Sequence, residues 1–314
     1  MKRVFLLFCF SCTLLLFVAC STQEEQGERL LKQDIEQEIK EHLQVLCGEK
    51  MAGRAGGTKG EAETALYLAE FLQEKGLKPA GEGETYFQTF PIKEYAPKKV
   101  GERMTFCPVS STEKGSSANV LGILEGRKKE VIIISAHYDH LGMINGQLYP
   151  GANDNASGVS TVLEIIAGLA EKKKPEKTLL FAFWGSEEKG LIGSRYFCLH
   201  STISWEQIKG IVNLDTIGNL LGEKKLLGWQ EKENEVTREI IEQLTEAGWQ
   251  ISWQNDPGHS SDHVSFSLKN VPGFTLLSPD WLKKNHTPLD TENEINTAPL
   301  REMTLSFIDI LSQI

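Results

Sequence analysis

Apolar and polar positions along this chain follow two different periods. Between residues 30 and 46 the apolar side chains recur at helical spacing, which predicts an amphipathic helix. A second helix is predicted from about residue 61 to residue 75, with Gly76 as its C-cap, and a strand over residues 86–92. From residue 119 onward, runs of strand length alternate with helical patterns: strands over 120–124, 131–136, 178–184, 211–214 and 274–277, and helices over 157–170, 236–247 and 299–311.

The run Val131, Ile132, Ile133 and Ile134 carries most information about the sheet. Four apolar β-branched residues in succession are typical of a strand that is covered on both faces. The alternation of strands and helices therefore predicts an α/β fold, a three-layer α/β/α sandwich around a mixed and mostly parallel central sheet. The chain has no internal repeat and no gap long enough for another domain, so residues 29–314 are predicted to form one domain.

The N-terminal segment has the pattern of a leader. A basic start precedes an apolar stretch over residues 4–18, which suits a signal peptide and is short for a membrane-spanning helix. The segment resembles a bacterial lipoprotein leader, in which residues 1–20 would be the signal peptide, Cys20 the lipidated residue and residues 21–28 a tether. An ordinary secretory leader and an uncleaved anchor are the alternatives. Each places the body of the protein outside the cytoplasm, either anchored in the cell envelope or secreted.

Charge and cysteine content exclude two classes of site. The formal net charge is −10, whereas nucleic-acid binding needs clustered lysine and arginine, so nucleic acid is not expected as a partner. Beyond the leader, three widely spaced cysteines remain without a C-x-x-C motif. We therefore expect no zinc–thiolate site at Cys47, Cys107 and Cys198, and buried free thiols, with a single disulfide as the alternative.

Five residues with metal-ligand chemistry stand at the edges of glycine-rich or strand-like segments. Four of them follow apolar runs, and ligands of open α/β sheets bind outside the carboxyl ends of the strands, so we expect them to converge on one edge. The fifth precedes a helix in a turn that contains glycine. Two imidazoles and three carboxylates suit a pair of zinc ions if one carboxylate bridges them. The candidates are His137, Asp154, Glu188, Asp215 and His286.

Two further acids have predicted catalytic roles. A ligating imidazole usually donates its other N–H to a carboxylate, and Asp139 is placed to orient His137 in this way. Glu187 and Glu188 are adjacent acids after an apolar strand, where like charges raise each other's pKa unless a cation relieves the repulsion. With Glu188 on the metal, Glu187 can take a proton from a zinc-bound water, whose pKa falls to about 7, and pass it to a leaving amine.

The motifs together resemble the M28 family of zinc metallopeptidases, whose aminopeptidases bind paired zinc ions. The similarity covers roughly residues 40–312, and the motifs occur in the order expected for the family. Each motif alone is modest evidence, but their order makes coincidence improbable. They are N-V-L-G (119–122), A-H-Y-D-H-L-G (136–142), D-N-A-S-G (154–158), E-E (187–188), N-L-D (213–215) and H-T-P (286–288).

The resemblance implies a role for each candidate. Two zinc ions per chain would be held with Asp154 as the bridging ligand, Glu187 would act as general base and acid, and Asp139 would orient a ligand. Ser261-Asp262-His263 matches a further family segment and is expected to support the ligands, whereas His140 and His259 are not expected to be ligands. The implied pairs are His137 with Asp215 on one ion, and Glu188 with His286 on the other.

The resemblance implies an aminopeptidase that hydrolyses N-terminal residues from peptide substrates. Three other functions stay open: a glutaminyl cyclase-like enzyme with a single zinc ion, a carboxypeptidase, and a binding lipoprotein without catalysis. The last is disfavoured because all five ligand positions and the position of the base are filled. No protease-associated insertion is visible, so loops of the catalytic domain are expected to select the substrate. Asn285 stands where several relatives carry an aromatic residue.

Overall fold

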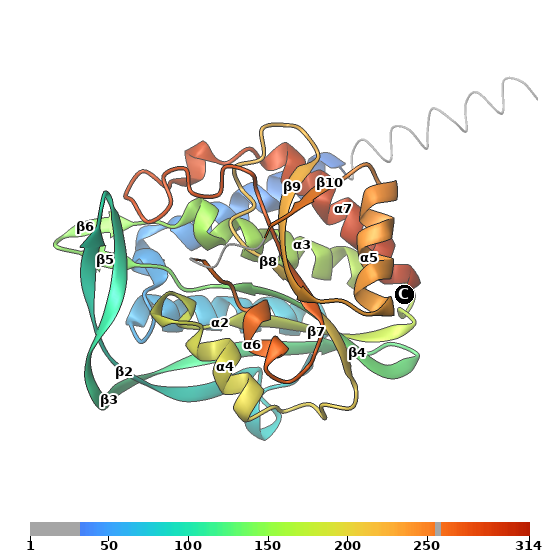
Figure 1. Cartoon of the computed structure of the whole chain (residues 1–314), viewed down its shortest axis with the longest axis horizontal. Coiled ribbons are helices and arrows are strands. Elements are labelled where there is room, and N and C mark those ends of the chain that lie inside the picture. The colour runs from blue at the N-terminus through green and yellow to red at the C-terminus, as the bar shows by residue number, and fades with distance from the viewer. Residues whose placement is uncertain (1–31, 255–258) are drawn as a thin grey trace, which may run out of the picture.

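The computed structural model describes residues 32–254 and 259–314. They form a mixed central sheet with helices on both faces (Figure 1), which confirms the α/β sandwich predicted from the alternation of strands and helices. The predicted signal peptide, Cys20 and the tether lie outside the described residues. Within the described part of the chain, no helix is both long and apolar enough to cross a membrane.

The central sheet contains nine of the described strands. Its order is β1-β3-β7-β4-β8-β11-β9-β10, and β2 pairs with β3 outside this path. The four central strands, β7, β4, β8 and β11, run parallel, whereas β3 and β9 pair antiparallel on either side of them. The bounds are β1 (Lys78–Pro79), β2 (Phe87–Val100), β3 (Arg103–Leu124), β4 (Lys128–His137), β7 (Lys177–Trp184), β8 (Ile208–Leu214), β9 (Lys225–Lys232), β10 (Gln250–Trp253) and β11 (Gly273–Leu277), with β5 (Gly142–Ile144) and β6 (Gln147–Tyr149) as a separate hairpin.

Helices cover both faces of this sheet, and short turns connect several of the strands. The first described helix spans residues 32–47. The others are α2 (Lys59–Glu74), α3 (Ser157–Ala170), α4 (Ile192–Leu199), α5 (Glu235–Glu246), α6 (His263–Ser267) and α7 (Thr297–Gln313), with the turns η1 (Glu49–Arg54), η2 (Glu82–Glu84), η3 (Ala152–Ala156), η4 (Glu187–Lys189) and η5 (Glu292–Glu294).

Strand β4 lies between two apolar clusters, as its run of β-branched residues predicts. Ile132 and Ile134 belong to the larger cluster, which the first helix, α2, α3, α5 and α7 cover. Val131 and Ile133 point into the smaller cluster, which α4 and α6 cover. All four side chains are buried. Because side chains alternate along a strand, both faces of β4 exclude water and the polar residue at its end is held rigidly.

Most predicted elements are present, but two strands are longer than predicted. Helix α3 spans the predicted residues, and α2 ends at Glu74 with Gly76 in the left-handed region at φ 75°. The strand predicted over residues 86–92 continues to Val100, and the strand predicted over residues 120–124 begins at Arg103. These added segments are largely polar or exposed, so they show no period-two pattern of apolar residues.

The added segments form one long hairpin. Strands β2 and β3 pair antiparallel from Phe87↔Val120 out to Val100↔Arg103, with Gly101 in the left-handed turn at φ 65°. In Figure 1 the hairpin reaches away from the sheet toward the end that carries β5 and β6. Near its tip, the N–H of Met104 donates a hydrogen bond to the carbonyl of His286, so the hairpin contacts a predicted ligand.

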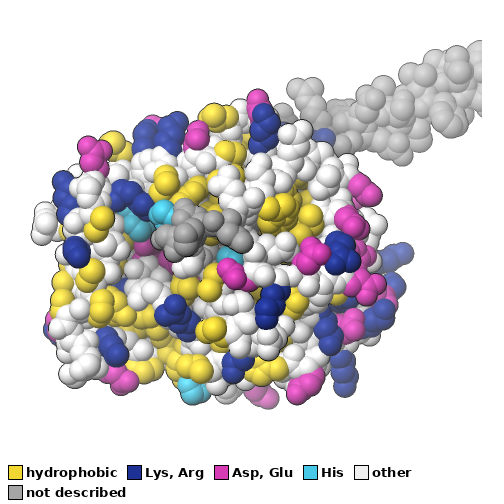
Figure 2. All heavy atoms as spheres, in the orientation of Figure 1, with side chains coloured by type: hydrophobic (Ala, Val, Ile, Leu, Met, Phe, Trp, Pro, Cys, Tyr) yellow, Lys and Arg dark blue, Asp and Glu magenta, His cyan; other side chains and the backbone are white. Residues whose placement is uncertain are grey.

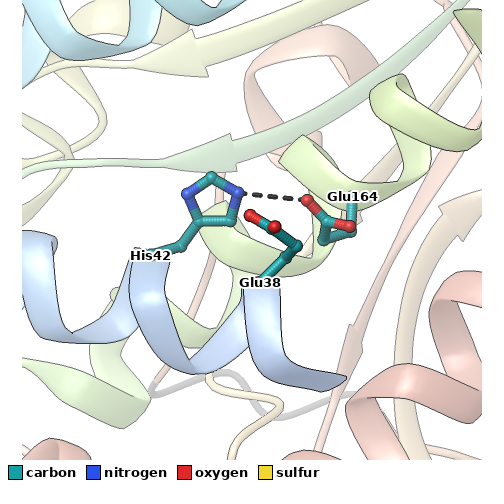
Figure 3. Close-up of side chains that lie close together, drawn as sticks. All are labelled: Glu38, His42 and Glu164. Carbon is teal, nitrogen blue, oxygen red and sulfur yellow. Dashed lines mark hydrogen bonds and ion pairs between the residues drawn. The ribbon is translucent and has the colours of Figure 1, made fainter. Parts of the chain in front are cut away.

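The first helix packs on α3 through a buried polar cluster (Figure 3). His42 Nε2 lies 3.1 Å from Glu164 Oε1, and His42 Nδ1 lies 2.5 Å from the Tyr67 hydroxyl. Burial raises the pKa of Tyr67, so this hydroxyl donates to Nδ1 and Nε2–H donates to Glu164. Glu38 lies beside this pair and could complete a cation site with it. Both imidazole nitrogens are already hydrogen-bonded, however, and we interpret the cluster as a structural contact.

The described cysteines are free, as predicted. Cys47 and Cys198 are buried and Cys107 is partly exposed. Burial raises the pKa of both buried thiols to about 12, so they are protonated at neutral pH and are poor metal ligands.

Candidate metal centre

The five predicted ligands meet at one edge of the sheet. His137 is the last residue of β4, Asp215 directly follows β8, and Glu188 lies in η4 after β7. His286 lies in the long connection after β11, and Asp154 lies in η3 at the start of α3. The three strands are neighbours in the parallel part of the sheet, so their carboxyl ends bring residues together that are far apart in sequence.

Asp154 lies between the two predicted imidazole ligands. Its Oδ1 is 3.2 Å from His137 Nε2, and its Oδ2 is 3.1 Å from His286 Nε2. The two oxygens of one carboxylate therefore face different imidazoles. This is the placement that a carboxylate needs in order to bridge two cations.

The remaining two carboxylates divide between the same imidazoles. Asp215 Oδ1 is 3.4 Å from His137 Nε2, and Glu188 Oε2 is 3.0 Å from His286 Nε2. The site thus consists of two sets of nitrogen and oxygen donors that share Asp154. Imidazole nitrogen and carboxylate oxygen are ligands that zinc takes in catalytic sites, so the donor set fits zinc.

A third imidazole, His140, lies closer to this site than the sequence indicated. Its Nδ1 is 2.9 Å from Glu188 Oε1 and 4.0 Å from Asp154 Oδ2, so it could also approach a cation held there. His286 is the better candidate ligand because its Nε2 is nearer to Asp154. The other ring nitrogen of His286 is also fixed by a hydrogen bond, whereas His140 Nε2 is buried without a partner among the described residues.

Backbone carbonyls orient both candidate ligand imidazoles. His286 Nδ1 donates to the carbonyl of Met104 over 2.7 Å, and His137 Nδ1 donates to the carbonyl of Asp139 over 3.2 Å. Each bond directs Nδ1 at a carbonyl and turns Nε2 toward Asp154, so Nε2 is the nitrogen that would bind a cation. The first bond comes from the tip of the β2–β3 hairpin, which sequence reasoning did not detect.

The carboxylate of Asp139 lies beside His137 but makes its hydrogen bonds elsewhere. Its Oδ1 is 3.8 Å from His137 Nδ1, which is within ion-pair distance and too long for a hydrogen bond. The same carboxylate accepts the backbone N–H of Glu187 over 2.8 Å and that of Glu188 over 3.3 Å. Ser186, which precedes them, lies in the left-handed region at φ 54°. Asp139 therefore stabilises the sharp turn that carries both acids.

The pKa values of the two adjacent acids, Glu187 and Glu188, are shifted in opposite directions. Burial raises the pKa of Glu187 well above its usual value; the charge of His137 opposes this shift, and the charges of Glu188 and Asp262 add to it. Burial also acts to raise the pKa of Glu188, but the charge of His286 and the hydrogen bonds from His140 and His286 hold it at about 2. Glu188 is thus fixed as an anion, while Glu187 can hold and release a proton.

The same excess of carboxylates raises the pKa values of the imidazoles of His137 and His286. Burial alone lowers the pKa of His137, yet the negative charges of Glu187 and Asp215 raise it well above its usual value. The pKa of His286 is raised in the same way against the effect of burial, mainly by the charge of Glu188. A buried cluster in which carboxylates outnumber imidazoles favours the binding of cations, which supports the fit to zinc.

Of the segment Ser261-Asp262-His263, which the resemblance suggests as support for the ligands, Ser261 bonds to a candidate ligand among the described residues. Ser261 Oγ donates to Asp215 Oδ2 over 2.6 Å and accepts a hydrogen bond from Asn213. His263 bonds to Thr275 over 2.7 Å, farther from the candidate ligands. The buried carboxylate of Asp262 has no hydrogen-bond partner among the described residues, and burial raises its pKa to about 7.

A cavity of about 240 Å³ opens beside the candidate ligands. In the face shown in Figure 2, histidine and acidic side chains come together near basic ones in a recess. One wall is aromatic: the rings of Trp229 and Trp281 lie 5.3 Å apart, and His259 lies 4.8 Å from Trp281. On another side Arg103 donates a hydrogen bond to Asn285, which donates to Asp154 Oδ2 over 2.5 Å. Sequence reasoning found neither the aromatic wall nor Arg103.

The family model described as Peptidase family M28 matches residues 119–311. Leucine aminopeptidase 1 of Trichophyton rubrum is 26% identical over 168 residues, which cover 51% of this chain and 42% of that protein. Aminopeptidase YwaD of Bacillus subtilis is 27% identical over 212 residues, which cover 60% of this chain and 42% of that protein. The match thus spans less than half the length of these two relatives.

Solved structures show the same fold at low identity. The zinc aminopeptidase BSAP from Bacillus subtilis has a TM-score of 0.66 and 18% identity, with 87% of this chain and 94% of that chain covered. A glutaminyl cyclase from Bacteroides thetaiotaomicron has a TM-score of 0.63 and 17% identity, with 89% of this chain and 98% of that chain covered. The family match covers most of the sheet and all five candidate ligands, and on this evidence the chain belongs to peptidase family M28.

Proposed function

We propose that the protein is a zinc-dependent aminopeptidase that removes N-terminal residues from peptides outside the cytoplasm. The observation that carries this proposal is the position of Asp154, whose two oxygens face two different imidazoles in a buried, acid-rich site. The names of the relatives agree with it, since the curated ones are aminopeptidases and one solved structure is a zinc aminopeptidase.

Five residues would hold two zinc ions. His137 and Asp215 would bind one, His286 and Glu188 the other, and Asp154 both. Zinc in such a site polarises a carbonyl and lowers the pKa of water, so that hydrolysis proceeds at neutral pH. His140 would not bind metal; its hydrogen bond holds the carboxylate of Glu188 in place.

Glu187 would move the proton. It lies in the cavity next to the candidate ligands and is not needed as one of them. Its raised pKa lets it accept a proton from the attacking water and deliver it to the amine that leaves. Asp139 would fix the position of this base, because it accepts the backbone N–H of Glu187. In this role Asp139 acts through Glu187 as well as through His137.

The cavity suits a peptide that enters by its N-terminus. The excess of buried carboxylates favours a free α-amino group close to the scissile bond. Trp229, Trp281 and Leu277 form an apolar wall, which fits an apolar first side chain. A panel of aminoacyl-amide substrates, assayed with and without a chelator, tests the proposal. Activity that survives metal removal would contradict it.

A glutaminyl cyclase is the second candidate because one solved structure with this fold has that activity in its name. Such an enzyme would need a single zinc ion, whereas two complete donor sets are present here. The number of zinc ions bound per chain, together with activity on aminoacyl and on N-terminal glutaminyl peptides, separates the two. Cyclisation without hydrolysis would favour the cyclase.

The location follows from the leader. We infer that Cys20 is lipidated and anchors the protein to the outside of a membrane, with residues 21–28 as the tether. Expression in a bacterial host with a radiolabelled fatty acid tests this inference. Wild-type protein should carry the label and sediment with membranes, and Cys20→Ser should lose both properties. An unlabelled wild-type protein in the medium would indicate an ordinary secretory leader.

A further inference from the structure

Arg103 brings a positive charge into the cavity from outside the sheet. It is the first residue of β3, next to the tip of the β2–β3 hairpin, and it lines the cavity together with the candidate ligands. Its guanidinium carbon lies 6.0 Å from the centre of the Trp281 ring, so it borders the aromatic wall. The other titratable residues that line this cavity are the acids and imidazoles of the candidate metal centre and His259 in the aromatic wall.

The guanidinium group has few partners. Among the described residues its one hydrogen bond runs from Nη2 to Asn285 Oδ1, and no carboxylate lies within ion-pair distance. Its Nε is buried without a hydrogen-bond partner. Arg301, by contrast, pairs with both Glu36 and Glu302. A partly buried guanidinium without a carboxylate in direct contact has unused hydrogen-bond donors, and arginine is the residue that most often binds planar anions.

Holding the hairpin in place does not require this charge. The backbone of Met104 already ties the hairpin to His286 by two hydrogen bonds, one in each direction. The contact of Arg103 with Asn285 is a bond to a neutral amide, which a neutral donor would satisfy equally well. The positive charge is therefore left for another partner.

The position of Arg103 limits what that partner is. The guanidinium of Arg103 donates to the side-chain amide of Asn285, and this amide donates in turn to Oδ2 of Asp154. Asp154 is the carboxylate that faces both imidazoles. Successive Cα atoms of a peptide lie about 3.8 Å apart, and a hydrogen bond spans about 2.9 Å. An anion bound by Arg103 would therefore belong to a residue within one or two peptide units of the scissile bond.

We propose that Arg103 binds a carboxylate of the peptide substrate and so makes the enzyme prefer short or acidic peptides. The inference rests on the proposed aminopeptidase function and names its substrate class. Two sources supply the same chemistry: the C-terminal carboxylate of a dipeptide or tripeptide, and the side chain of aspartate or glutamate next to the scissile bond. In both cases the planar guanidinium matches a planar carboxylate.

The test compares pairs of substrates that differ by one charge. Leu-Gly is compared with Leu-Gly-amide, and Leu-Glu-amide with Leu-Gln-amide, for the wild type and for Arg103→Gln. We expect wild-type kcat/KM to favour the charged member of at least one pair by roughly tenfold to a hundredfold, mostly through KM, as for a hydrogen bond to a charged group. In Arg103→Gln this ratio should fall to about one. The pair that shows the preference identifies the source of the carboxylate.

A control and a second measurement separate the possible outcomes. Lys98→Gln removes an exposed positive charge from the same hairpin and should keep the wild-type ratio. Calorimetric binding of Leu-Gly analogues with a reduced scissile bond, as free acid and as amide, measures the same preference without turnover. A wild type without preference, or a preference that survives in Arg103→Gln, overturns the inference. Failure to hydrolyse any of the four substrates would instead count against the proposed function, while the binding measurement still tests Arg103.

Discussion

The carboxylate of Asp139 accepts a hydrogen bond of 2.8 Å from the backbone N–H of Glu187. This contact joins the end of β4 to the turn after β7, and the other oxygen of Asp139 accepts the N–H of Glu188. The backbone carbonyl of Asp139 meanwhile orients His137. One residue therefore positions the proposed base and two proposed ligands, each through a different atom.

Asp139→Asn should impair both zinc binding and catalysis. The amide nitrogen that replaces one carboxylate oxygen would face a backbone N–H, so one of the two hydrogen bonds to the turn is lost. Groups that orient metal ligands typically contribute about 10- to 100-fold to metal affinity or activity, and we expect a loss in that range. Zinc titration and kcat/KM on an aminoacyl substrate measure it. Asp309→Asn, on the exposed side of α7, is the control and should behave as the wild type.

Glu187→Gln should bind zinc as the wild type does and lose most of its hydrolysis. The glutamine keeps the size of the side chain but cannot accept a proton, and general-base catalysis contributes about 10²- to 10⁴-fold. Glu188→Gln is the matched comparison, since we expect it to lose zinc as well as activity. Activity should be assayed beside metal content for both variants. Full activity in Glu187→Gln would exclude it as the base.

The bridging position of Asp154 predicts an asymmetry between two ligand substitutions. His286→Ala should remove one zinc ion and leave the set formed by His137 and Asp215. Asp154→Ala should weaken both sites, because its two oxygens face both imidazoles. Elemental analysis after dialysis against a fixed free zinc concentration gives the number of ions per chain. Equal loss in the two variants would show that the sites are not arranged around Asp154.

Most of the candidate ligands could be predicted because they stand next to a locally recognisable pattern. His137 ends a run of buried β-branched residues, and Asp215 follows another apolar strand, so the rule that ligands gather at strand ends located both. His286 lacks such a pattern, since it lies in the connection that follows β11, and only the family resemblance suggested it. Its orientation depends on Met104, 182 residues away in sequence, which no local pattern reveals.

The hairpin was missed for a physical reason. Its outer half is partly or fully exposed, with Met104 and Phe106 packed on a small separate cluster, so apolar and polar residues do not alternate regularly there. Its strands are held by backbone pairing that sequence composition does not report. Arg103, which lies in this hairpin, was not predicted to line the cavity, and neither were Trp229 and Trp281. The sequence thus indicated the candidate ligands and the candidate base, whereas the cavity walls formed by Arg103 and the tryptophans depend on long-range packing.

The contact between the first helix and α3 should be important for stability. His42→Ala would remove the hydrogen bond that the buried carboxylate of Glu164 accepts, and a hydrogen bond to a charged group contributes about 1.5–3 kcal/mol. Urea unfolding of the variant measures this cost. Gln44→Ala, exposed on the same helix, should change the free energy of unfolding by less than about 0.5 kcal/mol. If both variants unfold at the wild-type urea concentration, the helix is not held by this pair.

His263 should make stability depend on pH between about 4 and 6.5. Burial lowers its pKa from 6.5 to about 4 in the folded protein, so in this interval the unfolded chain binds a proton that the folded chain does not. The free energy of unfolding therefore falls as pH decreases from 6.5 to about 4, by about 3 kcal/mol for this group. Above pH 6.5 the contribution is constant.

The comparison with His263→Asn isolates this effect, because other groups titrate equally in both proteins and asparagine can still reach the hydroxyl of Thr275. Urea unfolding at a series of pH values, with a chelator present throughout, gives the difference between the two free energies. The stability of the wild type relative to the variant should be greatest above pH 6.5 and should fall by about 3 kcal/mol at pH 4. Parallel curves for the two proteins across this range would show that His263 takes up its proton without unfolding, and hence that it is not held neutral by burial.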